Sequence, residues 1–269
     1  MHITKIFALL FLSFFYSSNL LSIENKIMIA TTTSTYDSGL LNYLNEHFTK
    51  KHNITPHVIS QGTGQALRTA KDGNVEILIV HHKKSELEFM EEGFGLLRYD
   101  LMYNDFIIVG PKSDNKKCNK LKNKLTDIIS NNLQFLSRGD DSGTHKKELE
   151  LWKEINIDPK NFGSFYLEVG QGMGNTLLIA NEKLAYTITD RGTWLSFKKK
   201  ENLKIICESK PPLFNQYGVI LVNPSINKSL NYKSAEIYIN WLISMEGKNL
   251  INNFTIKNEQ LFFYNYKNN

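Results

Sequence analysis

Short apolar runs alternate with amphipathic segments along most of the chain. A first strand is predicted at residues 26–30, and a helix at 38–51 carries Leu40, Leu44 and Phe48 on one apolar face. Further strands are predicted at residues 57–60 and 75–82, followed by a helix that ends at Gly93. Strands that alternate with helices are typical of a parallel sheet with helices packed on its faces.

The second half of the chain repeats this pattern. An apolar strand is predicted at residues 105–111, strand–loop–helix units at 132–155 and 165–183, and a last long strand at 215–224. Two amphipathic helical segments follow. We therefore predict an α/β fold with a discontinuous first lobe, residues 23–105 and 216–269, and a second lobe, residues 106–215.

The first 22 residues have the pattern of an export signal. One Lys precedes an apolar run from Ile6 to Tyr16, and small and polar residues come next. The run is too short to span a bilayer comfortably. We predict a cleaved signal peptide, residues 1–22, cut near Ser18 or Ser22, and a periplasmic location; an uncleaved anchor is the alternative.

Composition excludes several classes of protein. The formal net charge is +5, the charges are dispersed, and no nucleic-acid-binding motif with interleaved aromatic residues is present. Cys118 and Cys207 are too few and too far apart for a zinc site, so no metal site is expected. In an exported protein the two cysteines form either one disulfide or two buried thiols.

Four loops between a predicted strand and a predicted helix are rich in Gly, Ser or Thr: TTTST (31–35), QGTGQ (61–65), SRGDDSGT (137–144) and GQGMGNT (170–176). A helix N-terminus offers unpaired N–H groups and a partial positive charge, and glycines let the backbone approach a ligand closely. One Ser or Thr at such a place is usually only a helix cap. Four such loops, one with five consecutive hydroxyls, favour an anion-binding site.

Arg138 would supply a full positive charge to that site. Its alternative role is a salt bridge to Asp140, Asp141 or Asp190. An ionised carboxylate can only accept hydrogen bonds, so Asp37, Asp140 and Asp141 are expected to cap helices or to position Arg138 instead of contacting the ligand. Many neutral donors and one Arg suit a fully deprotonated oxyanion.

No catalytic residue is predicted. Ser34 or Ser142 could act as a nucleophile, which leaves a secreted serine-dependent hydrolase as an alternative, but neither has an evident base or a GxSxG context. His81 and His82 are adjacent on a predicted strand and are interpreted as polar residues at its end. The P-loop and the GxGxxG fingerprint are both missing.

Several motifs together resemble the tungstate-binding periplasmic proteins of Tup-type ABC transporters, within the type II periplasmic-binding-protein superfamily. They are TTTSTYDSGLL, VISQGTGQAL, MYNDFIIVGP, SRGDDSGTHKKE, GQGMGNTL and YTITDRGTW, in this order. The SRGDDSGT block is also similar to the R-x-D-x-S-G-T loop of phosphate-binding proteins. The segment HHKKSELEF after the third strand departs from the family pattern and leaves any role of His82 open.

The resemblance implies two α/β lobes, each a mostly parallel sheet flanked by helices, joined by two crossing strands that close on the ion like a hinge. It places the ion against Thr31–Ser34 and an arginine matching Arg138. The loop argument adds positions in the other loops. The predicted ligand-binding residues are Thr32, Thr33, Ser34, Thr63, Arg138, Ser142, Gly143, Thr144, Gly172, Met173 and Gly174.

The resemblance further implies a monomeric solute-binding protein that captures tungstate and delivers it to an ABC permease in the inner membrane. No cofactor is expected, since tungsten would be bound only as its oxyanion. Molybdate or phosphate are the alternative ligands, because molybdate has nearly the same size and charge as tungstate.

Overall fold

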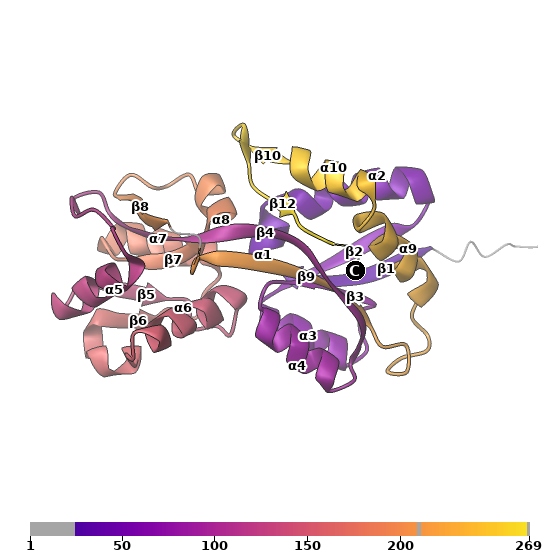
Figure 1. Cartoon of the computed structure of the whole chain (residues 1–269), viewed down its shortest axis with the longest axis horizontal. Coiled ribbons are helices and arrows are strands. Elements are labelled where there is room, and N and C mark those ends of the chain that lie inside the picture. Colours follow the sequence, from indigo (N-terminus) through magenta and orange to yellow (C-terminus); the bar gives the residue numbers. More distant parts are fainter. Residues whose placement is uncertain (1–24, 209–210, 268–269) are drawn as a thin grey trace, which may run out of the picture.

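The computed structural model describes residues 25–208 and 211–267, so the predicted signal peptide lies outside the described residues. Figure 1 shows two lobes side by side, with the strands β4 (Gly95–Pro111) and β9 (Phe214–Val222) running from one into the other. These two strands pair antiparallel along most of their length. They are the crossing strands that the resemblance implied. None of the helices in the described ranges is long and apolar enough to span a membrane.

The first lobe is built on a mixed sheet with the order β12-β4-β9-β3-β1-β2. Its further strands are β1 (Lys26–Thr32), β2 (Thr55–Gln61), β3 (Ile77–Val80) and β12 (Phe263–Tyr264). The pairs β1–β2 and β1–β3 are parallel, as the alternation of strands and helices predicted. β3–β9 and β4–β12 are antiparallel because the chain re-enters this lobe in the opposite direction.

Helices cover both faces of this sheet. They are α1 (Thr33–Asp37), α2 (Leu40–His52), α3 (Thr63–Lys71), α4 (Lys83–Glu91), α9 (Tyr232–Leu242) and α10 (Met245–Asn253). Successive strand residues point to opposite faces. Ile27 and Ile29 accordingly pack with α2, α9 and α10, whereas Ala30 packs with α3 and α4.

The second lobe has smaller sheets around the far half of β4. β7 (Thr187–Asp190) and β8 (Leu203–Glu208) pair antiparallel with β4, and β5 (Phe135–Ser137) pairs parallel with β6 (Tyr166–Glu168). The helices are α5 (Leu121–Ser130), α6 (Gly143–Glu154), η1 (Pro159–Phe165, a 3₁₀ helix), α7 (Met173–Lys183) and α8 (Arg191–Ser196). Two hydrophobic clusters with members from Phe106 to Leu213 form its core. The exact lobe boundaries remain a prediction.

Strand β4 starts ten residues earlier than the apolar run predicted, at Gly95 instead of residue 105. The missed half contains Arg98 and Asp100, which interrupt any apolar pattern. Arg98 is nevertheless a strand residue because its guanidinium pairs at 2.7 Å with both the buried Glu86 and Asp100. The hairpin of β10 (Thr255–Ile256) with β11 (Glu259–Gln260), and β12, were also not predicted, because strands of two residues have no periodicity.

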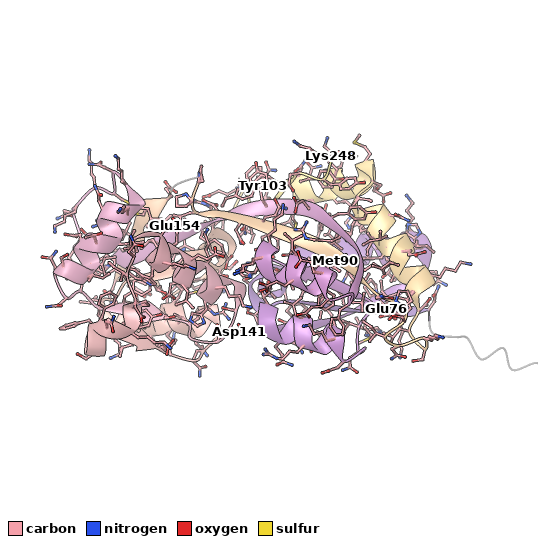
Figure 2. The ribbon with its side chains drawn as sticks, turned by 60° about the horizontal axis from the view of Figure 1, so that its bottom comes forward. Glu76, Met90, Tyr103, Asp141, Glu154 and Lys248 are labelled. Atoms are coloured by element: carbon pink, nitrogen blue, oxygen red, sulfur yellow. A yellow bond between two sulfur atoms is a disulfide. The ribbon has the colours of Figure 1, made fainter. Side chains whose placement is uncertain are left out.

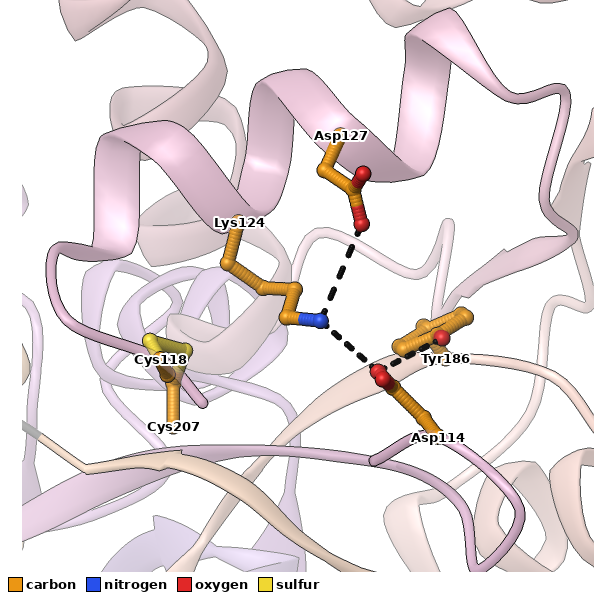
Figure 3. The surroundings of a disulfide bond; sticks show 6 residues. All are labelled: Asp114, Cys118, Lys124, Asp127, Tyr186 and Cys207. Atoms are coloured by element: carbon orange, nitrogen blue, oxygen red, sulfur yellow. Dashed lines mark hydrogen bonds and ion pairs between the residues drawn. A yellow bond between two sulfur atoms is a disulfide. The ribbon is translucent and has the colours of Figure 1, made fainter. Parts of the chain in front are cut away.

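Cys118 and Cys207 form a disulfide with Cα atoms 5.4 Å apart, which decides between the two alternatives left open by the sequence. The bond links the segment before α5 to β8 (Figure 3). Nearby, Lys124 donates to Asp114 at 2.7 Å, and the hydroxyl of Tyr186 donates to the same carboxylate oxygen at 2.9 Å. Burial alone would raise the pKa of Asp114, but these hydrogen bonds hold it below its usual value.

Candidate functional site between the lobes

The N-termini of α3 and α6 face each other across the boundary between the lobes. The backbone N–H of Gly64, in the first turn of α3, donates to the carbonyl of Asp141, just before α6, at 3.3 Å. Figure 2 shows Asp141 at this boundary. Arg68 and Lys146 each pair with the Asp141 carboxylate at 3.2 Å. Two helix N-termini that converge on one place create a region of positive potential.

The hydroxyl run TTTST lies at the end of β1, where the chain enters α1. Thr32 is the N-cap of α1 and its Oγ1 lies 2.5 Å from Thr35 Oγ1 and 3.3 Å from Ser34 Oγ. Thr31 donates to the carbonyl of Ile79 at 2.8 Å, and Thr33 begins the helix half-buried. The run is therefore a connected hydrogen-bond network, and several of its hydroxyls serve the fold as well as any ligand.

Arg138 follows β5 and is 3% exposed. Its Nε and one terminal nitrogen donate to Asp140 Oδ2 at 3.0 and 2.5 Å, so Asp140 is the salt-bridge partner among the three candidates. The charge of Arg138 helps to lower the pKa of His81 and opposes the burial that raises the pKa of Asp37. Both of these residues belong to the first lobe, so the guanidinium acts across the interlobe boundary.

Two hydroxyls of the predicted set are buried without a hydrogen-bond partner. Thr63 Oγ1 is the first side chain of α3, and Thr144 Oγ1 is in the first turn of α6; both residues are 0% exposed. A Cβ on Gly143 would lie 2.9 Å from Thr63 Oγ1, so the glycine allows α6 to approach α3 this closely. A buried hydroxyl that lacks a partner costs free energy unless a ligand supplies one.

The remaining predicted residues differ in their surroundings. Ser142 is the N-cap of α6, and its Oγ accepts from the His145 N–H at 3.2 Å. Met173 packs in the core of the second lobe, whereas Gly172 and Gly174 are exposed and have open space beside them. The structure thus brings the first three loops together, and the contribution of residues 172–174 stays a prediction.

Sequence reasoning missed a buried polar cluster on the crossing strands. Asn215 of β9 donates to Asn104 of β4 at 2.7 Å and to the hydroxyl of Tyr217 at 3.1 Å. Asn104 and Asn215 are register partners, and both are almost fully buried. Each asparagine stands beside a further polar residue, Asp105 on β4 or Gln216 on β9, but a single sequence does not show that the two strands pair at this position.

His81, which follows the last residue of β3 as the sequence predicted, also packs against this cluster. It is 4% exposed, and its ring centroid lies 4.9 Å from Tyr217 and 5.9 Å from Phe106. Burial is the main reason that its pKa falls to about 3, and the charge of Arg138 adds to the effect. The imidazole is therefore neutral at physiological pH.

A cleft of about 250 Å³ runs along the interlobe boundary past His81 and Asn215. Lys83, Lys84 and Lys147 line it, with Glu150 as the acidic residue. His82, whose role the sequence left open, is the N-cap of α4 and bridges the lobes through Glu150 at 3.1 Å. Among the described residues, no three His, Cys, Asp or Glu side chains gather closely enough to hold a metal ion.

Comparisons with known proteins agree with this architecture. Residues 24–246 match the model of the PBP superfamily domain. A curated tungstate-binding protein TupA from Peptoclostridium acidaminophilum is 49% identical over 236 residues, which cover 86% of this chain and 82% of that protein.

Two solved structures also align with nearly their whole length. The tungstate-binding protein TupA from Desulfovibrio alaskensis G20 has 40% identity and a TM-score of 0.78, covering 90% of this chain and 99% of that chain. The structure described as the tungstate ABC transporter from Geobacter sulfurreducens has 43% identity and a TM-score of 0.78, covering 86% and 99%. The chain therefore belongs to the PBP superfamily and, within it, to the family of the TupA proteins.

Proposed function

We propose that this protein binds tungstate as its oxyanion between the two lobes and delivers it to an ABC permease. The observation that carries the proposal is the pair of buried hydroxyls, Thr63 Oγ1 and Thr144 Oγ1, that lack protein partners, together with the buried Arg138 in the loop before α6. They come from different lobes and from the N-terminal turns of opposed helices. The relatives that carry the name tungstate-binding protein support the choice of anion.

The hydrogen-bond donors of the proposed site suit an anion that carries no proton. Tungstate is a tetrahedral dianion whose oxygens can only accept hydrogen bonds. Hydroxyls, backbone N–H groups and a guanidinium supply the donors. The Asp140 carboxylate accepts hydrogen bonds from Arg138 and from the Ser142 N–H, the latter at 3.2 Å. Because Asp140 orients the guanidinium, the acidic loop supports the site without placing a carboxylate against the ligand.

An anion at this place would stabilise contact between the lobes. Thr32–Ser34 and Thr63 belong to the first lobe, and Arg138 and Gly143–Thr144 to the second. A ligand that contacts both lobes binds the closed arrangement more tightly than an open one, and it shifts the population by that difference in affinity. Closure would then be the signal that the permease recognises.

The two serines considered as nucleophiles are poorly placed for catalysis, which supports a binding protein over a hydrolase. Ser34 Oγ lies 3.4 Å from His81 Nε2, but a histidine with a pKa of about 3 is a weak general base at neutral pH. The Oγ of Ser142 is engaged in capping α6. We therefore propose no catalytic role for either serine.

The cellular setting is part of the same proposal. The predicted signal peptide, the disulfide and membership of a family of ABC-transporter binding proteins support a protein of the periplasm that works with an inner-membrane permease. We propose that it acts as a monomer. No cofactor is needed for this function, since the anion itself is the cargo.

The test is calorimetric titration of the purified mature protein with tungstate, molybdate, sulfate and phosphate. We expect tight, one-to-one binding of tungstate and much weaker binding of sulfate, because a smaller oxyanion cannot reach donors from both lobes at once. Tighter binding of molybdate or phosphate would reassign the ligand. An absence of heat and of thermal stabilisation with all four anions would refute oxyanion binding altogether.

A further inference from the structure

The imidazole of His81 is held in one orientation in the interlobe cluster. Phe106 and Tyr217, on the two crossing strands, pack against its ring at a tilt, and its Nε2 lies 3.4 Å from Ser34 Oγ. Its Nδ1 is buried and has no partner within hydrogen-bond distance, although the Asn215 side chain lies close enough to oppose the lowering of the imidazole pKa. A buried nitrogen without a partner is costly, so its presence needs an explanation.

The unpartnered nitrogen faces the beginning of α6. A Cβ on Gly143 would lie 2.8 Å from His81 Nδ1 and 2.9 Å from Thr63 Oγ1. Two unpartnered polar atoms of the first lobe are thus directed at the same turn of the second lobe. Thr144, whose hydroxyl is also unpartnered, is the next residue of that turn.

A neutral imidazole has one donor and one acceptor nitrogen. If the Ser34 hydroxyl donates to Nε2, the proton resides on Nδ1, and Nδ1 becomes a donor that points to the cluster of other unpartnered donors. Thr63, Thr144 and His81 are then alike, because each carries a buried donor that no protein acceptor reaches within hydrogen-bond distance.

We propose that His81 is a further ligand-binding residue, whose neutral imidazole donates Nδ1–H to an oxygen of the bound oxyanion beside Gly143. This inference rests on the proposed binding of tungstate in the same cluster. It adds a hydrogen bond without adding a second full charge, so that Arg138 remains the cation nearest to the ligand. It also gives Ser34 a positioning role, since its hydroxyl selects the tautomer.

Two substitutions separate the ring nitrogens. The amide nitrogen of asparagine can take the place of Nδ1, and that of glutamine can take the place of Nε2. We expect His81→Asn to retain tungstate affinity within about threefold, and His81→Gln to lose about 10- to 100-fold, the range for one hydrogen bond to a charged group. His57→Gln, an exposed histidine on β2, is the matched control and should leave the affinity unchanged.

The opposite order, with His81→Gln close to wild type and His81→Asn weak, would overturn the inference, and so would equal affinities in the two variants. A second readout guards against variants that fold poorly. In the ¹⁵N-labelled wild-type protein with tungstate, Nδ1 should carry the proton and its resonance should shift on binding; an unprotonated Nδ1 overturns the inference. If the wild-type protein binds no oxyanion, the proposed function itself fails; if it binds and the histidine variants do not differ, only this inference fails.

Discussion

The backbone N–H of Gly64 donates to the carbonyl of Asp141 across the boundary between the two lobes, at 3.3 Å. Gly64 has no side chain at a point where a Cβ would collide with the Asp141 carboxyl group, whose Cγ would lie 2.6 Å away. The contact between the N-termini of α3 and α6 thus depends on a glycine in one lobe and on the backbone of the other.

This relationship predicts that Gly64→Ala weakens oxyanion binding by hindering closure. Overpacking at a tight contact typically costs about 1–3 kcal/mol, or about 5- to 150-fold in affinity. Calorimetry with tungstate measures the effect. Because the nearest obstacle is the Asp141 side chain, the double variant Gly64→Ala/Asp141→Ala should recover part of the lost affinity; failure of any rescue would show that the carboxylate is not the obstacle.

Arg138→Ala should reduce tungstate affinity by about 100-fold or more, because charge-assisted hydrogen bonds are the strongest in such a site. It should also destabilise the protein by about 1–3 kcal/mol, since the partly buried Asp140 loses its cation. Adding Asp140→Asn restores most of the stability, because the amide oxygen can still accept from the Ser142 N–H. The double variant should bind tungstate as weakly as Arg138→Ala does. Recovery of binding together with stability would reduce Arg138 to a structural role.

Thr63→Val and Thr144→Val should leave the stability of the ligand-free protein unchanged or higher, but should weaken tungstate binding. Each removes a buried hydroxyl without a partner, so the melting temperature without anion should be unchanged or higher. Affinity for tungstate should fall by about 1–3 kcal/mol. Thr49→Val is the control, because its hydroxyl already donates to the Ile54 carbonyl at 3.0 Å: it should lower stability and leave binding intact. Thr63 and Thr144 variants that behaved like Thr49→Val would contradict a ligand role.

Glu148 provides a prediction about pH. Burial raises its pKa from 4.5 to about 7, although Oε1 accepts from Trp152 at 3.1 Å and from Tyr166 at 2.7 Å. The folded state therefore binds this proton more tightly than the unfolded state, so its contribution to stability is greatest below pH 4.5 and is lost as pH rises through 7.

Chemical unfolding of Glu148→Gln at pH 5 and at pH 8 tests this. The amide keeps an acceptor for Trp152 and Tyr166 but cannot ionise, so relative to wild type the variant should gain about 2.5 kcal/mol between these pH values. The comparison with wild type cancels the pH dependence of other carboxyls, such as Glu86, whose pKa burial raises to about 6. A difference that does not change with pH would show that Glu148 ionises at its ordinary pKa.

The disulfide should stabilise the second lobe without affecting binding. The cysteines are 89 residues apart, and a cross-link of that length contributes about 2–5 kcal/mol in proteins of this kind. Cys118→Ser/Cys207→Ser should lower the melting temperature, and a reducing agent should lower that of the wild-type protein alone. Tungstate affinity should stay within about twofold. A large loss of affinity would show that the bond shapes the interlobe site.

Much of the architecture follows from local pattern. The apolar runs and the face of Leu40, Leu44 and Phe48 predicted β1, α2 and the alternation of strands and helices, because burial on a sheet requires these periods. The same reasoning failed for the first half of β4. Arg98 is half-buried there because Glu86 and Asp100 neutralise it, and no local pattern shows such partners.

The sequence by itself indicated which loops could bind an anion, since Gly, Ser and Thr between a strand and a helix have local meaning, and it predicted Arg138 as the cation among them. Only the tertiary structure decided which atoms are unpartnered. The hydroxyls of the TTTST run largely bond within the protein, whereas Thr63, Thr144 and His81 keep free polar atoms. The physical reason is that a hydrogen bond depends on the distance between two atoms in the folded protein, which residues far apart in sequence decide. His81 after β3, Thr63 of α3 and Gly143 of α6 meet between the two lobes, which β4 and β9 connect.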